Sequence, residues 1–327
     1  MNAALTRWAL RRLGTAVVVL AAVAVLVFVL FEALDSDAAT VVLARRGGAE
    51  PSPEQLAALR AELGLDRPAP VRFADWASRF AHGDLGTSLL SGRPVADVLL
   101  GRMANSAVLA LVTAVLLVPL ALGLGLLAGA RPGSRTDRAI SMGALTAESL
   151  PPFASGVVLI ATVSLTLRLL PAVSLLPTGV PAWSRPQILV LPVLCLLAGL
   201  APHPVRMVRA QTAQVVAAPY IRTARLNGVR GPRLLLKHVA PNAVSAAVHP
   251  LAGSLVGLIG GVAVVETLFG YPGVSQELLR AVAGRDFPFV QSAAVLLAAA
   301  GIGLYLLADL VTMLTSPRAR DLVLERR

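Results

Sequence analysis

The sequence predicts an all-α membrane protein with six transmembrane helices. Of its 327 residues, 56% are hydrophobic and only 14% are charged, whereas soluble domains carry roughly 25% charged residues. Apolar runs recur at lengths close to the roughly 20 residues that a helix needs to cross a bilayer. Prolines interrupt the third and fourth runs. The six expected spans are 13–34, 106–129, 140–167, 187–208, 243–269 and 289–315.

The first span is expected to be retained. Arg7, Arg11 and Arg12 precede it, as basic residues precede the apolar part of a secretory signal peptide. The apolar run from Leu13 to Phe31 is longer than the roughly 7–15 residues of such a signal. We therefore interpret it as a membrane anchor.

Arginine placement predicts the orientation. With the N-terminus inside, basic clusters fall on the cytoplasmic side, and the two short outer loops hold only two arginines each. Both termini are therefore expected in the cytoplasm, and topology explains the net charge of +11 better than nucleic-acid binding does. The cytoplasmic clusters are Arg7, Arg11 and Arg12; Arg131, Arg135 and Arg138; the basic residues from Arg206 to Lys237; and Arg318, Arg320, Arg326 and Arg327.

The segment 35–101 is too long for a simple connection, and we expect it to form a small extracytoplasmic domain. Ser52 can cap a helix that begins at Pro53, with Gln55 three residues after the cap, and Gly64 can end it. A second short helix is expected to carry aromatic residues on one side: Phe73, Trp76 and Phe80.

The most informative polar stretch is Pro219–Asn242, which lies between two apolar spans. A short amphipathic helix ending at Gly228 would present arginines to a partner protein, and glycine there permits a sharp turn or a close approach. Charge alone fits equally well with a basic loop that only sets topology. The basic residues of the stretch are Arg222, Arg225, Arg230, Arg233 and Lys237.

This stretch resembles the inner-membrane permeases of peptide/nickel ABC importers. The resemblance lies in the spacing Tyr-x-Arg-Thr-Ala-Arg-x-x-Gly, followed by a His ten residues after the Gly and an Asn four residues later. The stretches Gly83–Val95, Glu266–Ala281 and Arg285–Gln291 resemble the same family, so the resemblance covers nearly the whole chain. One departure lies at Ala217, Ala218 and Pro219, since the family often has an acidic residue just before the Tyr. The resemblance implies an ATPase-coupling segment formed by Tyr220, Arg222, Thr223, Ala224, Arg225, Gly228, His238 and Asn242.

The resemblance also implies partners and a location. It implies half of a two-permease pore in the plasma membrane, with a second permease, two ATPase subunits and an extracytoplasmic substrate-binding protein. Peptides are the leading substrate class, with nickel chelates and glutathione-like molecules open. Neither a metal nor a cofactor is expected, nor is enzyme activity, since the chain has no G-x-x-x-x-G-K-[ST] loop. The expected segments are 1–34, 35–101, a five-helix core 102–315 that includes coupling residues 209–242, and a tail 316–327.

Polar residues in or near the spans are candidates for the translocation pathway, because charges in lipid are unfavourable. For each ionisable candidate, a structural hydrogen bond is the alternative. The rival function is an ion-coupled secondary transporter that would use Glu148 and Asp309 directly. A membrane-embedded hydrolase is a weaker rival, since it would need a nucleophile beside His249. The pathway candidates are Glu148, Ser149, His249, Glu266 and Asp309.

Two glycines and a cysteine inside the spans are expected to serve helix packing rather than catalysis or binding. Gly125 and Gly129 would allow a neighbouring helix to approach closely. Cys195 is the only cysteine, so the chain cannot form an internal disulfide. It is expected to be a small buried residue.

Overall fold

The structure is a computed structural model that describes residues 2–33, 39–40, 42–43, 52–62, 64–177 and 180–315. Within these ranges the regular elements are helices, and an isolated bridge joins Thr87 and Pro94. The chain divides into two compact units. The large unit is built around Ser106–Tyr271, with Met1–Arg11 and Gly301–Arg327, and the small unit comprises Arg12–Asn105 and Pro272–Ala300.

Four helical stretches are long and apolar enough to cross a membrane by themselves: Leu10–Glu32, Val95–Ala130, Leu251–Phe269 and Phe287–Leu307. They lie in the helices α1 (Asn2–Glu32), α5 (Val95–Ala130), α12 (Ala240–Phe269) and α14 (Phe287–Thr315). This composition indicates a multi-pass membrane protein.

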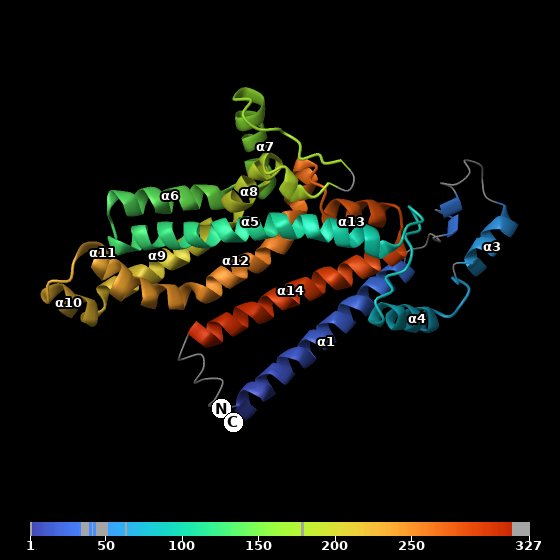
Figure 1. Cartoon of the computed structure of the whole chain (residues 1–327), viewed down its shortest axis with the longest axis horizontal. Helices are drawn as coiled ribbons and strands as arrows, with labels where there is room; N and C mark the ends of the chain where they lie inside the picture. The colour runs from blue at the N-terminus through green and yellow to red at the C-terminus, as the bar shows by residue number, and fades with distance from the viewer. Residues whose placement is uncertain are drawn as a thin grey trace. The chain divides into compact units, whose positions relative to one another are not determined.

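Two further candidate spans are bent, as their internal prolines suggest. α6 (Arg135–Ser149) meets Pro152–Thr166, which comprises α7 (Pro152–Leu159) and the π-helix η1, at 104°. α8 (Gln187–Leu200) meets α9 (Pro202–Ala217) at 48°. Figure 1 shows α7 rising away from α6. The described residues thus hold four candidate spans, or up to six if each bent pair is one span.

The core of the large unit forms where α12 packs against α7, α8 and α9. α8 is hydrophobic around its circumference and buries residues on several sides, as expected of a helix enclosed by other helices. Cys195 is fully buried in this core, and its Sγ lies 3.4 Å from the carbonyl oxygen of Pro152. The prediction of a small buried residue at this position is confirmed.

The predicted helix start at Ser52 is confirmed in the small unit, where α3 spans Pro53–Glu62. The backbone N–H of Ser52 donates to Oε1 of Gln55 at 3.1 Å, and the N–H of Gln55 donates to Oγ of Ser52 at 3.2 Å. These reciprocal bonds form a capping box. Gly64 has a φ of 64°, a conformation suited to the end of a helix.

The predicted aromatic helix is also present, as α4 (Ala69–Ala81). Its Phe73 and Trp76 have ring centroids 5.9 Å apart, and Trp76 and Phe80 have theirs 5.2 Å apart. Trp76 is buried in a cluster with residues of α1 and α14 that belong to the same unit. The aromatic face thus fastens α4 to these helices.

Candidate functional site

The polar segment after α9 folds into short helices around an apolar centre. These are α10 (Pro219–Leu226), α11 (Gly231–Leu234) and the π-helical turn η3 (Leu235–Val239). Ile221 of α10 is fully buried and packs with residues of α11 and η3. α10 also packs against the preceding α9. The segment is therefore an ordered extension of α9.

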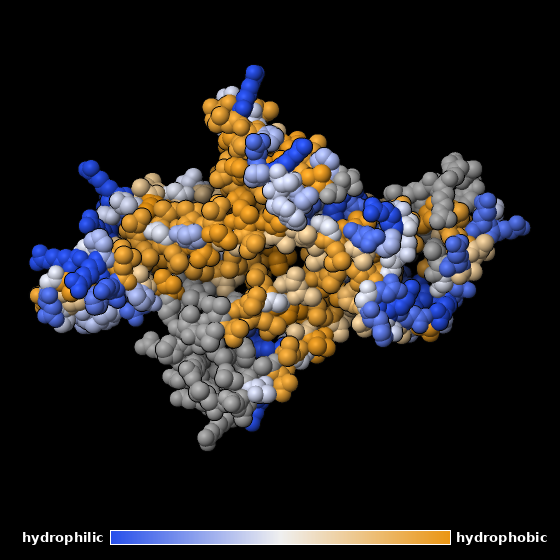
Figure 2. Space-filling model, in the orientation of Figure 1, coloured by the Kyte–Doolittle hydropathy of each residue, from blue (hydrophilic) through white to orange (hydrophobic). Residues whose placement is uncertain are grey.

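The outward face of α10 is both basic and apolar. Arg222 and Arg225 are exposed. Leu226 beside them is 81% exposed, the largest value among the exposed large hydrophobic residues in the described ranges, and Tyr220 is 47% exposed. Hydrophilic atoms gather over this end of the large unit in Figure 2. Arginine and tyrosine are enriched in protein interfaces, so this face has the composition of a contact surface.

Leu226 was not among the residues that the sequence singled out. It follows the buried Ile221 by five positions, which places the two side chains roughly 140° apart around the helix. That angle puts Leu226 on the exposed side with the arginines. The angular position was the available signal, although an apolar residue is normally assigned to the buried face.

The way in which α10 ends explains why position 228 is a glycine. The N–H of Val229 donates to the carbonyl of Ala224 at 3.0 Å, and that of Gly228 donates to the carbonyl of Arg225 at 3.1 Å. These are the two bonds of a Schellman motif, which requires a left-handed residue after the helix. Gly228 has a φ of 85°, and a Cβ there would meet no atom within 4 Å. Backbone conformation rather than crowding therefore favours glycine here.

The remaining predicted coupling residues lie around this helix. α10 begins at Pro219, whose carbonyl accepts from Oγ1 of Thr223 at 3.3 Å. Proline suits the first turn of a helix, so α10 starts without the acidic residue that the resemblance led us to expect. His238 is half-buried on η3, and its carbonyl accepts from Nδ2 of Asn242 in α12 at 2.9 Å.

An ion pair that the sequence analysis missed joins α6 to α9. Asp137 is buried in the first turn of α6 and accepts two hydrogen bonds from Arg209, from Nε at 2.8 Å and from Nη2 at 2.7 Å. Ser134 caps α6 by accepting from the N–H of Asp137 at 3.1 Å. The spacing of a capping serine and an acid three residues later could have indicated the start of α6, but not Arg209 as the partner of Asp137.

Glu148 and Ser149 lie at the sharp break between α6 and α7. The carboxylate of Glu148 pairs with the guanidinium of Arg206 on α9, and both side chains are partly exposed. The Oγ of Ser149 donates to the carbonyl of Thr146 at 2.8 Å, a local bond at the end of α6. Glu148 therefore has a charged partner within the same unit.

The other pathway candidates occupy different environments. Glu266 near the end of α12 is fully buried and accepts a hydrogen bond from Oγ of Ser106 in α5. Burial, with the nearby Glu266 carboxylate second, raises the pKa of the Tyr271 hydroxyl just beyond α12. Asp309 is half-buried in α14. The side chain of His249 lies outside the described residues.

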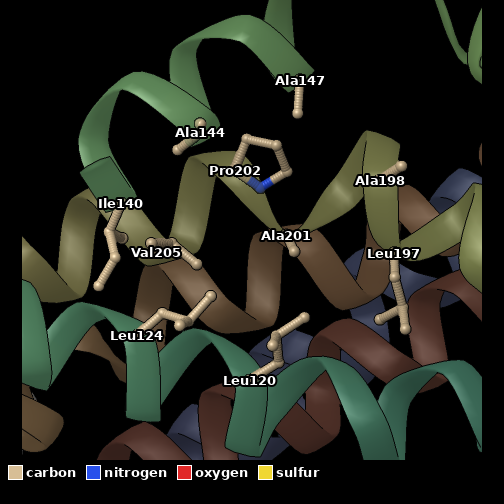
Figure 3. A pocket seen from close by; sticks show the side chains of 11 residues that line it. Leu120, Leu124, Ile140, Ala144, Ala147, Leu197, Ala198, Ala201, Pro202 and Val205 are labelled. Carbon is tan, nitrogen blue, oxygen red and sulfur yellow. The ribbon is translucent and has the colours of Figure 1, made fainter. Parts of the chain in front are cut away.

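A hydrophobic cavity of about 320 Å³ separates α6 from the bend between α8 and α9. α6 contributes Gly143, Ala144 and Ala147, and the opposite wall includes Ala198 and Pro202. Figure 3 shows Ala144 and Ala147 of α6 near Ala198 and Pro202, above Leu120 and Leu124 of α5. The small size of these alanines leaves the space open.

Two motif stretches noted separately in the sequence meet in the small unit. Asp286 is buried and accepts from Oγ of Ser88 and from the N–H of Leu89 at 3.1 Å. It also accepts from the N–H of Phe289 at 3.4 Å, in the first turn of α14. The stretch Gly83–Val95 is thus pinned to the start of α14 by one carboxylate.

Comparison with known proteins finds two matching family descriptions. Residues 121–321 match "Binding-protein-dependent transport system inner membrane component", and residues 5–110 match the corresponding N-terminal family. A probable peptide ABC transporter permease of Sinorhizobium fredii is 32% identical over 313 residues, covering 95% of this chain and 98% of the relative.

Two further relatives are similar over nearly their whole length. A putative peptide transport system permease of Brucella abortus is 31% identical, over 97% of this chain and 99% of its own. A glutathione transport system permease of Salmonella choleraesuis is 32% identical, over 96% of this chain and 98% of its own.

Proposed function

This chain belongs to the family of binding-protein-dependent transport system inner membrane components, and we propose that it forms half of the pore of an ATP-driven peptide importer. The family works with a second permease, ATPase subunits and a substrate-binding protein. Two ATPase subunits for each pair of permeases is the arrangement we propose. An ion-coupled secondary transporter is not favoured, because this family draws its energy from the ATPase.

We propose short peptides, including glutathione-like tripeptides, as the substrate class. The proposal is supported by the names of relatives that align over nearly their whole length, which include peptide and glutathione permeases. Mass spectrometry of the ligand that co-purifies with the cognate binding protein is the test. A peptide supports the proposal, and a nickel chelate would contradict it.

We propose that α10 docks on the ATPase. The observation that carries this proposal is the exposed face of Arg222, Arg225 and Leu226 on a helix fixed to the membrane helices by the buried Ile221. In this proposal Tyr220, with Thr223, Ala224, Gly228, His238 and Asn242, forms or supports that face. ATP-driven closure of the ATPase would then displace α10, and α9 would carry the movement to the spans.

Cross-linking tests this docking directly. Cys195 is the only cysteine, so a Cys195→Ser background gives a protein without thiols. Leu226→Cys should then form a cross-link to an ATPase subunit carrying a single cysteine in its cleft. Leu145→Cys on α6, a position that is also exposed, serves as the control and should not. Cross-linking of the control alone would contradict the docking proposal.

We propose a topology of six spans with both termini in the cytoplasm. It is supported by the arginine distribution and by two bent helix pairs that could each serve as a single span. In this topology 35–101 is extracytoplasmic, 102–315 is the permease core with coupling residues 209–242, and 316–327 is a cytoplasmic tail.

We propose that Glu148 and Ser149 line the translocation route. The proposal is supported by their place at a broken span and by the partial exposure of Glu148. His249 and Asp309 remain candidates for the same route. For Glu266 we propose instead that it holds α12 to α5, because its carboxylate is fully buried against Ser106.

A further inference from the structure

Asp137 is bound more completely than a helix cap requires. It is only 3% exposed. Besides the two bonds from Arg209, its carboxylate accepts from the N–H of Gly133 at 2.8 Å and from Oγ of Ser141 at 3.3 Å. Each oxygen therefore accepts two hydrogen bonds, one of them from the planar guanidinium of Arg209. A bidentate pair of this kind fixes orientation as well as distance.

Close packing fixes the same part of α9 to α5. A Cβ at Gly129 would lie 2.5 Å from the carbonyl oxygen of Arg209, and one at Gly125 would lie 2.5 Å from Cβ of Val208. These distances show that the two helices approach each other closely at consecutive turns. The predicted role of these glycines is confirmed. α9 is thus held by α5 through packing and by α6 through the ion pair.

α9 is also continuous with the docking segment. Its last turn contributes Val215 and Val216 to the apolar cluster around Ile221. Only Ala218 separates the end of α9 from α10, and its N–H donates to the carbonyl of Val215 at 3.0 Å. These contacts connect α10 to α9 and, through Arg209, to α6.

The rest of α6 borders open space. The cavity of about 320 Å³ lies between it and the α8–α9 bend. α6 ends at the 104° break beside Glu148. At this end Glu148 pairs with Arg206 of α9, and both side chains are partly exposed. α6 is therefore fixed near Asp137 and has open space near Ala147.

We propose that Asp137 and Arg209 are a positioning pair for energy coupling. The pair transmits movement of α10 to α6, so that α6 turns about this fixed point and shifts the break at which Glu148 lies. This inference rests on the proposed docking of α10. Neither residue touches substrate or ATP in this role.

The test compares coupling with assembly in the reconstituted complex. Asp137→Asn keeps the shape of the side chain and removes its charge, and Arg209→Lys keeps the charge but loses the bidentate geometry. Both variants should retain the Leu226→Cys cross-link to the ATPase. The amount of radiolabelled tripeptide imported per ATP hydrolysed should fall by about fivefold or more. A factor of about five is the lower end of the coupling usually found between two sites of a protein.

The matched controls are Asp75→Asn and Arg67→Lys, which alter an exposed ion pair of 2.5 Å in the small unit. They should leave the import ratio unchanged. An unchanged ratio of import to ATP hydrolysis in Arg209→Lys would overturn the positioning role, even if Asp137→Asn does not accumulate in the membrane. If Leu226→Cys forms no cross-link to the ATPase in a protein with Asp137 and Arg209 intact, the docking of α10 is refuted instead. The two failures are therefore distinguishable.

Discussion

The contact between α5 and α9 at Gly129 can be tested by adding a single methyl group. In Gly129→Ala, the new Cβ would lie 2.5 Å from the carbonyl oxygen of Arg209 and 2.5 Å from Cβ of Thr212. Neither atom is the end of a flexible side chain, so the helices themselves must move apart. Gly123→Ala on the same helix is the matched control, because a Cβ there meets nothing within 4 Å.

The expected magnitude follows from the difference between the two variants. Alanine is favoured over glycine inside a helix by about 1 kcal/mol, and both variants gain this contribution. Overpacking of a close contact typically costs about 1–3 kcal/mol, and only Gly129→Ala incurs it. The free energy of unfolding should therefore be about 1–3 kcal/mol lower in Gly129→Ala than in Gly123→Ala.

The assay is thermal unfolding of the purified variants in one detergent at one scan rate, followed by tryptophan fluorescence. A fixed scan rate is needed because unfolding of a membrane protein in detergent is often irreversible, and the midpoint then depends on rate. Gly129→Ala should unfold at a lower temperature than Gly123→Ala. Equal midpoints for the two variants would show that α9 does not approach α5 as closely as described.

Three further outcomes are expected. In intact cells, an impermeant thiol reagent should label Ala58→Cys and not Ala319→Cys; the reverse pattern would refute the topology. Glu148→Gln should alter uptake or substrate preference while the complex still assembles, and normal uptake of a wide peptide panel would remove it from the route. Asp286→Ala should lower stability by about 2–3 kcal/mol in thermal unfolding, because it leaves the hydroxyl of Ser88 and the N–H of Leu89 without an acceptor. An unchanged midpoint would show that these hydrogen bonds do not hold the two stretches together.

Local signals were sufficient where one short stretch determines the structure. The capping box at Ser52 and the aromatic face of α4 form within a few residues of sequence, so their patterns predicted them. The end of α10 at Gly228 is likewise local, since a Schellman motif needs only the last turn and a left-handed residue.

Contacts between distant parts of the chain could not be predicted in this way. Asp137 and Arg209 are 72 positions apart, and nothing in either stretch identifies the other as its partner. Asp286 and Ser88 are 198 apart. The apolar pattern indicated spans but not the angle of their breaks, because a proline marks a break without setting the direction in which the chain continues.

ATP hydrolysis by the reconstituted complex, with and without peptide-loaded binding protein, tests the docking of α10 most directly. Gly228→Val forces a β-branched residue into a left-handed conformation, and the double change of Arg222 and Arg225 to Glu reverses the charge of the exposed face. Arg135→Glu, at an exposed arginine of α6, is the control. Stimulation by the binding protein should fall in the first two and persist in the control. Full stimulation in both α10 variants would show that the segment is only a basic loop.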